Sequence, residues 1–139
     1  MTTLHLRIAT LERTVFDEDI ESVTLPGVEG ELTILKNHIP LITPLALGEI
    51  VARRGGEEFS MTVSGGMLEV TPRRVLVLAD QSERAEEIDI EFAEEARKRA
   101  ERLMEEHKED AEEFAAAEAE LQRALMRIKI AKRRKSGQR

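Results

Sequence analysis

The hydrophobic pattern of this 139-residue chain changes its period near residue 86, and no single type of regular element satisfies both periods. Before that point apolar and polar residues alternate, as in strands that bury one face. After it apolar residues recur every three or four positions, as on one face of a helix. The chain is therefore expected to have an N-terminal β domain over 1–86 and a C-terminal helical domain over 87–139.

The N-terminal domain is predicted to contain many short strands separated by tight turns. Alternation is clearest over 4–8, 22–25, 32–34 and 59–63. The breaks carry turn chemistry, because glycine accepts positive φ and proline fixes φ. They are Pro26-Gly27, Gly55-Gly56, Gly65-Gly66 and Pro72-Arg73. The segment VLVLA, 75–79, is apolar on both faces and suits a central strand, and the whole pattern is typical of a β-sandwich or barrel.

The C-terminal domain is predicted to be an antiparallel pair of amphipathic helices. After Asp80 the chain is rich in Ala, Glu, Lys and Arg, which favour helix. A polar link at 107–110 separates two apolar stripes, which consist of Phe92, Ala96, Ala100 and Leu103, and of Phe114, Ala117, Leu121, Leu125 (or Ala124) and Ile128. Because much of the contact is alanine on alanine, little apolar area is buried, and we expect the hairpin to open at modest cost. A permanently folded hairpin is the alternative.

The charge of the C-terminal half changes sign at Arg123. Residues 88–122 have a net charge of −8, whereas residues 123–139 carry eight Lys or Arg and no Asp or Glu. A basic end of this kind is either a solvated helix end or a surface for an acidic partner. A nucleic-acid partner is not expected, because the chain has four Phe and no Tyr or Trp for base stacking. The acidic β domain would also repel a polyanion.

Composition narrows the class of protein further. The absence of cysteine excludes disulfides and thiolate metal sites. No apolar run approaches the ~18 residues of a membrane span. The N-terminus has no basic region followed by an apolar one, so no export signal is expected. These features predict a soluble, cytoplasmic chain.

Two carboxylates and a histidine, Glu29, Glu31 and His38, lie within ten residues and have the composition of an acid/base set. They also suit the tip of a docking loop, and a sandwich of this size has little room for a substrate pocket beside them. The three histidines lack metal-ligand spacing, and HExxH, GxSxG and glycine-rich phosphate loops are absent. No catalytic residue and no metal ligand is predicted, and at this point ordinary loop chemistry is favoured over an acid/base set, with docking left open.

Three blocks of the sequence, in order, resemble the epsilon subunit of F-type ATP synthases. The first is PGVEGELTILKNHIPL, where Thr33, Lys36 and Asn37 replace the family's Gly, Pro and Gly. Asn37 tolerates the left-handed conformation that glycine would supply. The second block is SGGMLEV at 64–70, and the third comprises VLAD and AEEID at 77–80 and 85–89. The resemblance spans residues 5 to about 130.

This resemblance implies a non-catalytic subunit of the rotor stalk, in a complex that makes ATP with the energy of proton transport. The fold would be a ten-stranded β-sandwich followed by an antiparallel helical hairpin. The sandwich would contact the gamma subunit and the c-ring, with Glu29, Glu31 and His38 at the docking loop. The subunit would lie at the cytoplasmic face of a bacterial cell membrane, which it would touch only through the complex.

The resemblance also implies a regulatory role for the hairpin. In the family the hairpin moves between a folded form and an extended form, which enters the catalytic head of alpha and beta subunits and suppresses ATP hydrolysis. The residues expected to contact acidic segments of the beta subunits are Arg123, Arg127, Lys129, Lys132 and Arg133.

Some bacterial members of this family bind ATP through an Ile/Leu-Asp-x-x-Arg-Ala motif. Here the corresponding stretch, 88–93, reads IDIEFA. Phe92 stands in the place of the arginine and cannot pair with phosphate. Asp89 and Arg99 remain as candidate nucleotide contacts. We therefore predict no cofactor, and an ATP-sensing regulatory module on the same fold is the alternative interpretation.

Overall fold

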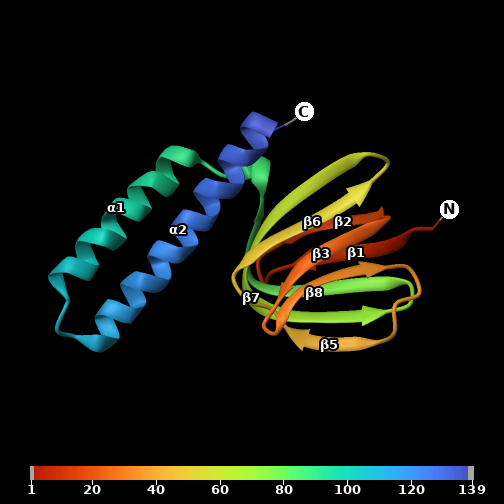
Figure 1. Cartoon of the computed structure of the whole chain (residues 1–139), viewed down its shortest axis with the longest axis horizontal. Helices are drawn as coiled ribbons and strands as arrows, with labels where there is room; N and C mark the ends of the chain where they lie inside the picture. The colour runs from red at the N-terminus through yellow and green to blue at the C-terminus, as the bar shows by residue number, and fades with distance from the viewer. Residues whose placement is uncertain (1, 138–139) are drawn as a thin grey trace. The chain divides into compact units, whose positions relative to one another are not determined.

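The computed structural model describes the backbone of residues 2–137 and the side chains of residues 2–133. The chain divides into two compact units, and the division falls between Ala85 and Glu86. The sequence places the boundary one residue later. Each unit has its own architecture (Figure 1).

The N-terminal unit is built from strands that pair in the order β2-β1-β8-β7-β6-β3-β4, with β5 paired to β7. These strands are β1 (Leu4–Ala9), β2 (Thr14–Ile20), β3 (Ser22–Gly27), β4 (Gly30–Leu35), β5 (Leu41–Pro44), β6 (Gly48–Arg54), β7 (Glu57–Thr71) and β8 (Arg74–Arg84). All neighbours are antiparallel except β1 and β8, which run parallel. The predicted β-sandwich followed by a helical hairpin is confirmed.

The strand number differs from the ten that the resemblance implies, since the described residues form eight strands. Part of the difference arises in β7, which has 15 residues and changes partner along its length. Its first part pairs with β6 and its last part, from Met67 to Val70, pairs with β5. Between them Gly65 and Gly66 adopt φ of 75° and 127°, and such glycines let a strand bend at a corner. One continuous strand therefore serves where two were expected.

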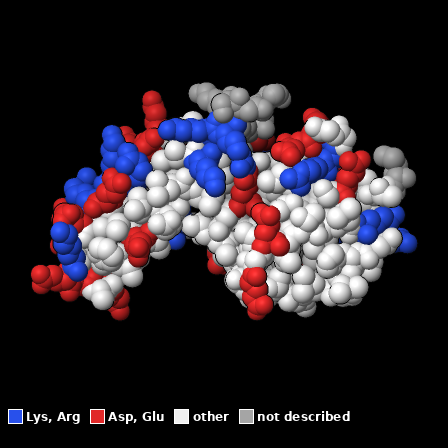
Figure 2. Space-filling view, viewed as in Figure 1, with Lys and Arg blue, Asp and Glu red and all other residues white. Residues whose placement is uncertain are grey.

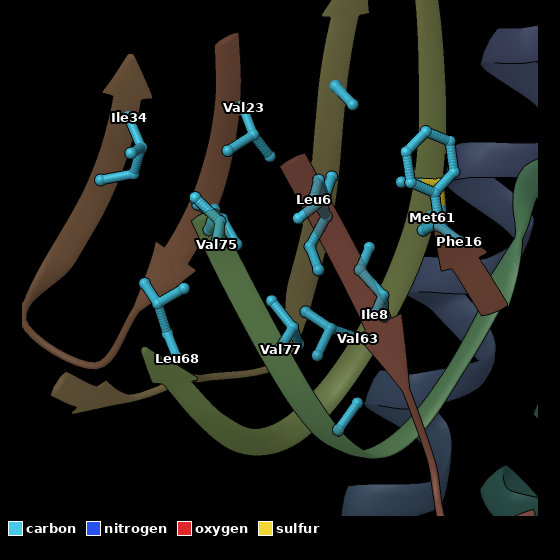
Figure 3. Close-up of a cluster of buried hydrophobic side chains, with 14 of the residues drawn as sticks. Leu6, Ile8, Phe16, Val23, Ile34, Met61, Val63, Leu68, Val75 and Val77 are labelled. Atoms are coloured by element: carbon cyan, nitrogen blue, oxygen red, sulfur yellow. The ribbon is translucent and has the colours of Figure 1, made fainter. Parts of the chain in front are cut away.

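A single apolar cluster fills the interior of this unit. In Figure 3 side chains from six strands converge on the same space, where each is 1% exposed or less; they are Leu6, Ile8, Phe16, Val23, Ile34, Met61, Val63, Leu68, Val75 and Val77. They alternate along their strands, as the period of two requires, except that the phase changes between Val63 and Leu68 on β7, where Gly65 and Gly66 interrupt the strand. The ring of Phe16 packs 5.6 Å from that of Phe59, centroid to centroid. This core fixes the strands, and with them the side chains on their opposite face.

The C-terminal unit consists of two antiparallel helices, α1 (Ile90–Glu106) and α2 (Ala111–Gly137), which follow a short 3-10 turn η1 (Ala85–Glu87) (Figure 1). Asp110 begins α2, because its Oδ1 accepts hydrogen bonds from the backbone N–H groups of Glu112 and Glu113, both at 3.2 Å. The predicted polar link is thus a tight turn between the helices.

Alanines are buried along the hairpin, which agrees with the small area of contact that the sequence predicts. The buried residues of α1 are Ala93 and Ala100, and on α2 they include Ala117 and Ala124, with the larger Ile128 and Ile130 near the end of the helix. The prediction that Phe92 belongs to the packed stripe is wrong, because its side chain is 54% exposed. Residues 93 and 100 are two turns apart on one line, and Phe92 lies about 100° away from that line.

Candidate functional site

The structure does not bring the predicted acid/base set together. Glu29 and Glu31 flank Gly30, whose φ of 134° forms the exposed turn between β3 and β4. His38 follows the other end of β4, and six strand residues at about 3.3 Å each separate the two ends by about 20 Å. Proton transfer between these groups is therefore excluded, and the two carboxylates form a separate acidic turn.

The loop around His38 is held by its own backbone. Asn37 has φ of 69°, the one positive value outside glycine among the described residues. Its N–H donates to the carbonyl of Pro72 at 2.7 Å, and His38 N–H donates to the carbonyl of Leu35 at 3.2 Å. The ring Nδ1–H of His38 donates to the carbonyl of Ile39 at 2.7 Å. Asn37 thus adopts the left-handed conformation predicted for it from the sequence, and the loop exposes Ile39.

An apolar surface on the N-terminal unit escapes the sequence analysis. We call it the outer apolar face and define it by Ile42, Pro44, Met67 and Leu78. Met67 pairs directly with both Pro44 and Leu78, so their side chains point to the same side of the sheet. Ile42, Met67 and Leu78 are 69%, 44% and 55% exposed. Figure 2 shows the surface over β5 largely without charged side chains.

The signal for this face lies in VLVLA, which is apolar on both faces and is predicted to form a central strand. This strand is β8, which lies between β1 and β7. Val75 and Val77 are buried, whereas Leu78 on the opposite face is exposed. Periodicity identifies two apolar faces, but only the pairing of β8 with its neighbours shows which face meets the core. Apolar patches surrounded by polar residues mark interaction sites.

Charged side chains on β1, β2, β7 and β8 border the outer apolar face. His5 donates a hydrogen bond to Asp19 at 2.8 Å and contacts Asp17 more closely still. Hydrogen bonds to Asp19 and then Asp17 raise the pKa of His5 above its ordinary value. Arg74 on β8 reaches Glu69 on β7 at 4.0 Å. An apolar centre with a charged rim has the composition of a protein–protein interface.

The cations predicted to act on an acidic partner lie on the C-terminal part of α2, and two of them contact α1. The guanidinium of Arg127 lies 5.9 Å from the ring centroid of Phe92. Lys132 Nζ lies 3.7 Å from a carboxylate oxygen of Glu94. Arg123 pairs along its own helix with Glu120 at 3.0 Å. Lys129 and Arg133 are exposed.

The two candidate nucleotide contacts are not brought together either. Asp89 Oδ1 accepts a hydrogen bond from the backbone N–H of Phe92 at 3.1 Å and caps α1. Arg99 is an exposed residue of α1, about 15 Å further along the axis at 1.5 Å per residue. The carboxylate of Asp89 therefore has a structural partner at the start of the helix.

Across residues 2–133 no group of three or more His, Asp or Glu side chains is placed to hold a metal ion. Neither described helix combines the length and the apolar character needed to cross a membrane. The features that remain are the outer apolar face, the acidic turn, the His38 loop and the basic part of α2.

Two family descriptions match the chain, and together they cover most of it. Residues 3–85 match the beta-sandwich domain of the ATP synthase delta/epsilon chain. Residues 86–132 match the long alpha-helix domain of the same chain. The ATP synthase epsilon chain of Dehalococcoides mccartyi is 52% identical over 135 residues, which are 97% of this chain and 96% of that one. That of Moorella thermoacetica is 47% identical over 132 residues, with 94% and 98% covered.

Solved structures resemble the fold at lower identity. A chain in the mitochondrial ATP synthase of Euglena gracilis, solved with the catalytic head and c-ring, superposes with a TM-score of 0.77 at 22% identity. The match covers 90% of this chain and 79% of that one. A chain of the central stalk and c-ring of Tetrahymena thermophila ATP synthase gives 0.56 at 13% identity, with 92% and 96% covered. These likenesses support the two-unit fold.

Proposed function

This chain belongs to the ATP synthase delta/epsilon chain family and is an epsilon subunit of the F-type complex, and we propose that its two units divide coupling and regulation between them. The N-terminal unit couples the gamma subunit to the c-ring of the rotor. The C-terminal hairpin limits ATP hydrolysis by the catalytic head. The subunit itself is non-catalytic, in keeping with the separation of Glu31 from His38 by the length of β4.

The outer apolar face is the observation that carries the coupling role. Ile42, Met67 and Leu78 are exposed on a sheet whose other face contributes residues such as Leu68 and Val77 to the buried core, so covering them adds apolar contact without rearranging that core. We assign this face to the gamma subunit. The acidic turn of Glu29 and Glu31 adjoins this face, because the N–H of Val28 in the turn donates to the carbonyl of Pro44 at 3.3 Å. We assign the turn to the polar loops of the c-ring.

The loop that contains His38 is assigned to the same rotor contacts. Its backbone is fixed by the hydrogen bonds of Asn37 and His38 described above, and Ile39 at its tip is 75% exposed. A rigid loop with an apolar tip loses little conformational entropy on docking. The subunit reaches the cytoplasmic face of the membrane through these protein contacts.

The basic part of α2 is the source of inhibition in this proposal. In an extended hairpin, Arg123, Arg127 and Lys129 would follow one another along a free helix and meet acidic segments of the beta subunits. Lys132 and Arg133 continue the same basic run. Ion pairs formed within a narrow cavity are less screened by salt than pairs on a surface.

Adding the chain to catalytic heads that contain gamma but lack epsilon tests both roles. The full chain is compared with a chain cut after Glu87, which retains the complete core of the N-terminal unit. The full chain is expected to bind and to lower ATP hydrolysis, whereas the cut chain binds without inhibiting. If both bind and neither inhibits, coupling stands and the regulatory role is wrong. If neither binds, both roles are wrong.

A further inference from the structure

Phe92 has an unusual place in the hairpin, because it is a large apolar residue that the helix pair does not bury. Its side chain is 54% exposed, although its neighbour Ala93 is fully buried. The guanidinium of Arg127, from the opposite helix, lies 5.9 Å from its ring centroid. This distance is within the range of a cation–π interaction. Phe92 therefore contributes to the hairpin through Arg127 and not through the alanine seam.

Glu94, two residues further along α1, makes a second contact with a cation of α2, in this case an ion pair. Its carboxylate accepts a hydrogen bond from Arg97 Nε at 3.0 Å and lies 3.7 Å from Lys132 Nζ. Arg97 is in turn fixed by Glu101, which accepts from Nη1 at 3.0 Å. The hydrogen bond from Arg97 and the charges of Arg97 and Lys132 lower the pKa of Glu94, so its carboxylate stays ionised. This chain of contacts along α1 holds the carboxylate in place for Lys132.

We propose that Phe92 and Glu94 are positioning residues that form a two-point latch, which holds Arg127 and Lys132 on α1 while the hairpin is closed. The inference deepens the function proposed above and rests on it, because the same two cations are assigned to the acidic partner. A cation stacked on Phe92 or paired with Glu94 cannot reach that partner at the same time. Inhibition therefore requires the latch to open first.

Each of the two contacts in the latch is weak, so a small change in conditions or partners can shift the hairpin between its closed and open forms. Both contacts are partly exposed, and interactions of this kind change an equilibrium by about two- to fivefold each. The buried residues of α1 beneath them are alanines, which supply little apolar area, although α2 also buries Ile128 and Ile130. The two contacts therefore add measurably to what favours the closed form. Closure in this chain therefore depends in part on the side chains of Phe92 and Glu94.

The latch is tested by measuring hairpin opening in the full chain. Because the chain has no cysteine, spin labels can be placed on exposed residues of the two helices through Lys98→Cys and Gln122→Cys. The distribution of label distances then reports the closed and open fractions. Phe92→Ala and Glu94→Gln are each expected to raise the open fraction about two- to fivefold, and the double variant about tenfold.

Matched variants separate the latch from general loss of stability. Phe92→Trp keeps an aromatic face and is expected to restore closure, whereas Phe92→Leu keeps apolar bulk and is expected to open like Phe92→Ala. Glu95→Gln removes a neighbouring exposed carboxylate and should leave the distances unchanged. Closure retained by Phe92→Leu, or opening by Glu95→Gln equal to that of Glu94→Gln, would overturn the latch.

Inhibition of ATP hydrolysis is the second readout. The variants that open are expected to inhibit epsilon-depleted catalytic heads at a several-fold lower concentration than the unaltered chain. If they open but inhibit no more strongly than the unaltered chain, the latch does not control the cations and the inference is overturned. If no chain inhibits at all while the distances still respond, the latch stands as a property of the hairpin and the proposed regulatory function is what falls.

Discussion

Met67 on β7 and Leu78 on β8 lie directly opposite each other, and both remain exposed although each is adjacent in sequence to a buried core residue. The strand period places Leu68 and Val77 inside and this pair outside. The core therefore does more than hold the fold together, because it fixes the position of an apolar pair on the surface. The pair is therefore the part of the outer apolar face that a gamma subunit would cover first.

Replacing Met67 or Leu78 by Asp should abolish tight binding to the gamma subunit. A carboxylate at the centre of an apolar interface loses its hydration without gaining a partner. Residues at such central positions typically contribute 2 kcal/mol or more, so we expect the Kd to rise by about 30-fold or more. Titration of the variants onto gamma-containing heads that lack epsilon measures this change.

The matched control is Leu35→Asp. Leu35 is 56% exposed on β4 and pairs with Ser22, away from the outer apolar face. All three substitutions lie at exposed positions, so their free energies of unfolding should be within about 0.5 kcal/mol of the unaltered chain. Equal weakening by Leu35→Asp would show that the docking surface has been misplaced.

Removing three cations from α2, by Arg123→Ala, Arg127→Ala and Lys129→Ala together, should relieve the inhibition of ATP hydrolysis. Each charge lost leaves an acidic group of the partner without its counter-ion inside the complex. The concentration needed for half-inhibition is expected to rise by about tenfold or more. Steady-state hydrolysis by epsilon-depleted heads, measured against concentration of the chain, gives this value.

The control for that variant removes the same number of charges from the other helix. Lys98, Arg99 and Arg102 are exposed residues of α1, and their joint replacement by Ala should leave half-inhibition nearly unchanged. Unaltered inhibition by the α2 variant, or equal relief by the α1 variant, would mean that total charge matters and that the basic run has no specific role.

The fold could be predicted from the sequence because the apolar periods differ so clearly on the two sides of residue 86. The sites were harder to predict, for two physical reasons. Glu31 and His38 are near in sequence but lie at opposite ends of β4, since an extended strand separates its ends more than any other element. The sequence predicts Phe92 on the packed face of α1 because alanines lie on that face and also on the adjacent face that contains Ala93. The apolar pattern alone does not show which of the two faces meets α2.

The pair of carboxylates beside His5 predicts a pH-dependent contribution to stability. The pKa of His5 is raised from its ordinary 6.5 by hydrogen bonds to Asp19 and Asp17, so the folded state holds the proton more tightly than the unfolded state. The stabilisation is therefore fully present below about pH 6.5 and is lost as the pH rises through the folded pKa. Because the ring is exposed, its size should stay below about 1 kcal/mol.

Urea unfolding of the unaltered chain and of His5→Gln at pH 5.5 and pH 8.5 measures this contribution. The unaltered chain should exceed the variant in stability more at the lower pH than at the higher one. Asp17→Asn with Asp19→Asn should remove the difference between the two pH values, because the partners of the imidazolium are then neutral. An advantage of the unaltered chain that grows with pH would contradict the assigned direction of the pKa shift.

Gly66 should be far less tolerant of substitution than Gly55, although both adopt positive φ. A Cβ on Gly66 would lie 2.3 Å from the carbonyl oxygen of Leu78 and 2.8 Å from Cα of Ala79, so the backbone of β8 would have to move. A Cβ on Gly55 meets nothing within 4 Å, and Gly55→Ala carries only the conformational cost of about 1–2 kcal/mol. We expect Gly66→Ala to lower the free energy of unfolding by clearly more than Gly55→Ala, and to weaken gamma binding as well, because the displaced carbonyl belongs to a residue of the outer apolar face. Equal losses of stability in urea unfolding would show that the close approach of β7 to β8 relaxes without cost.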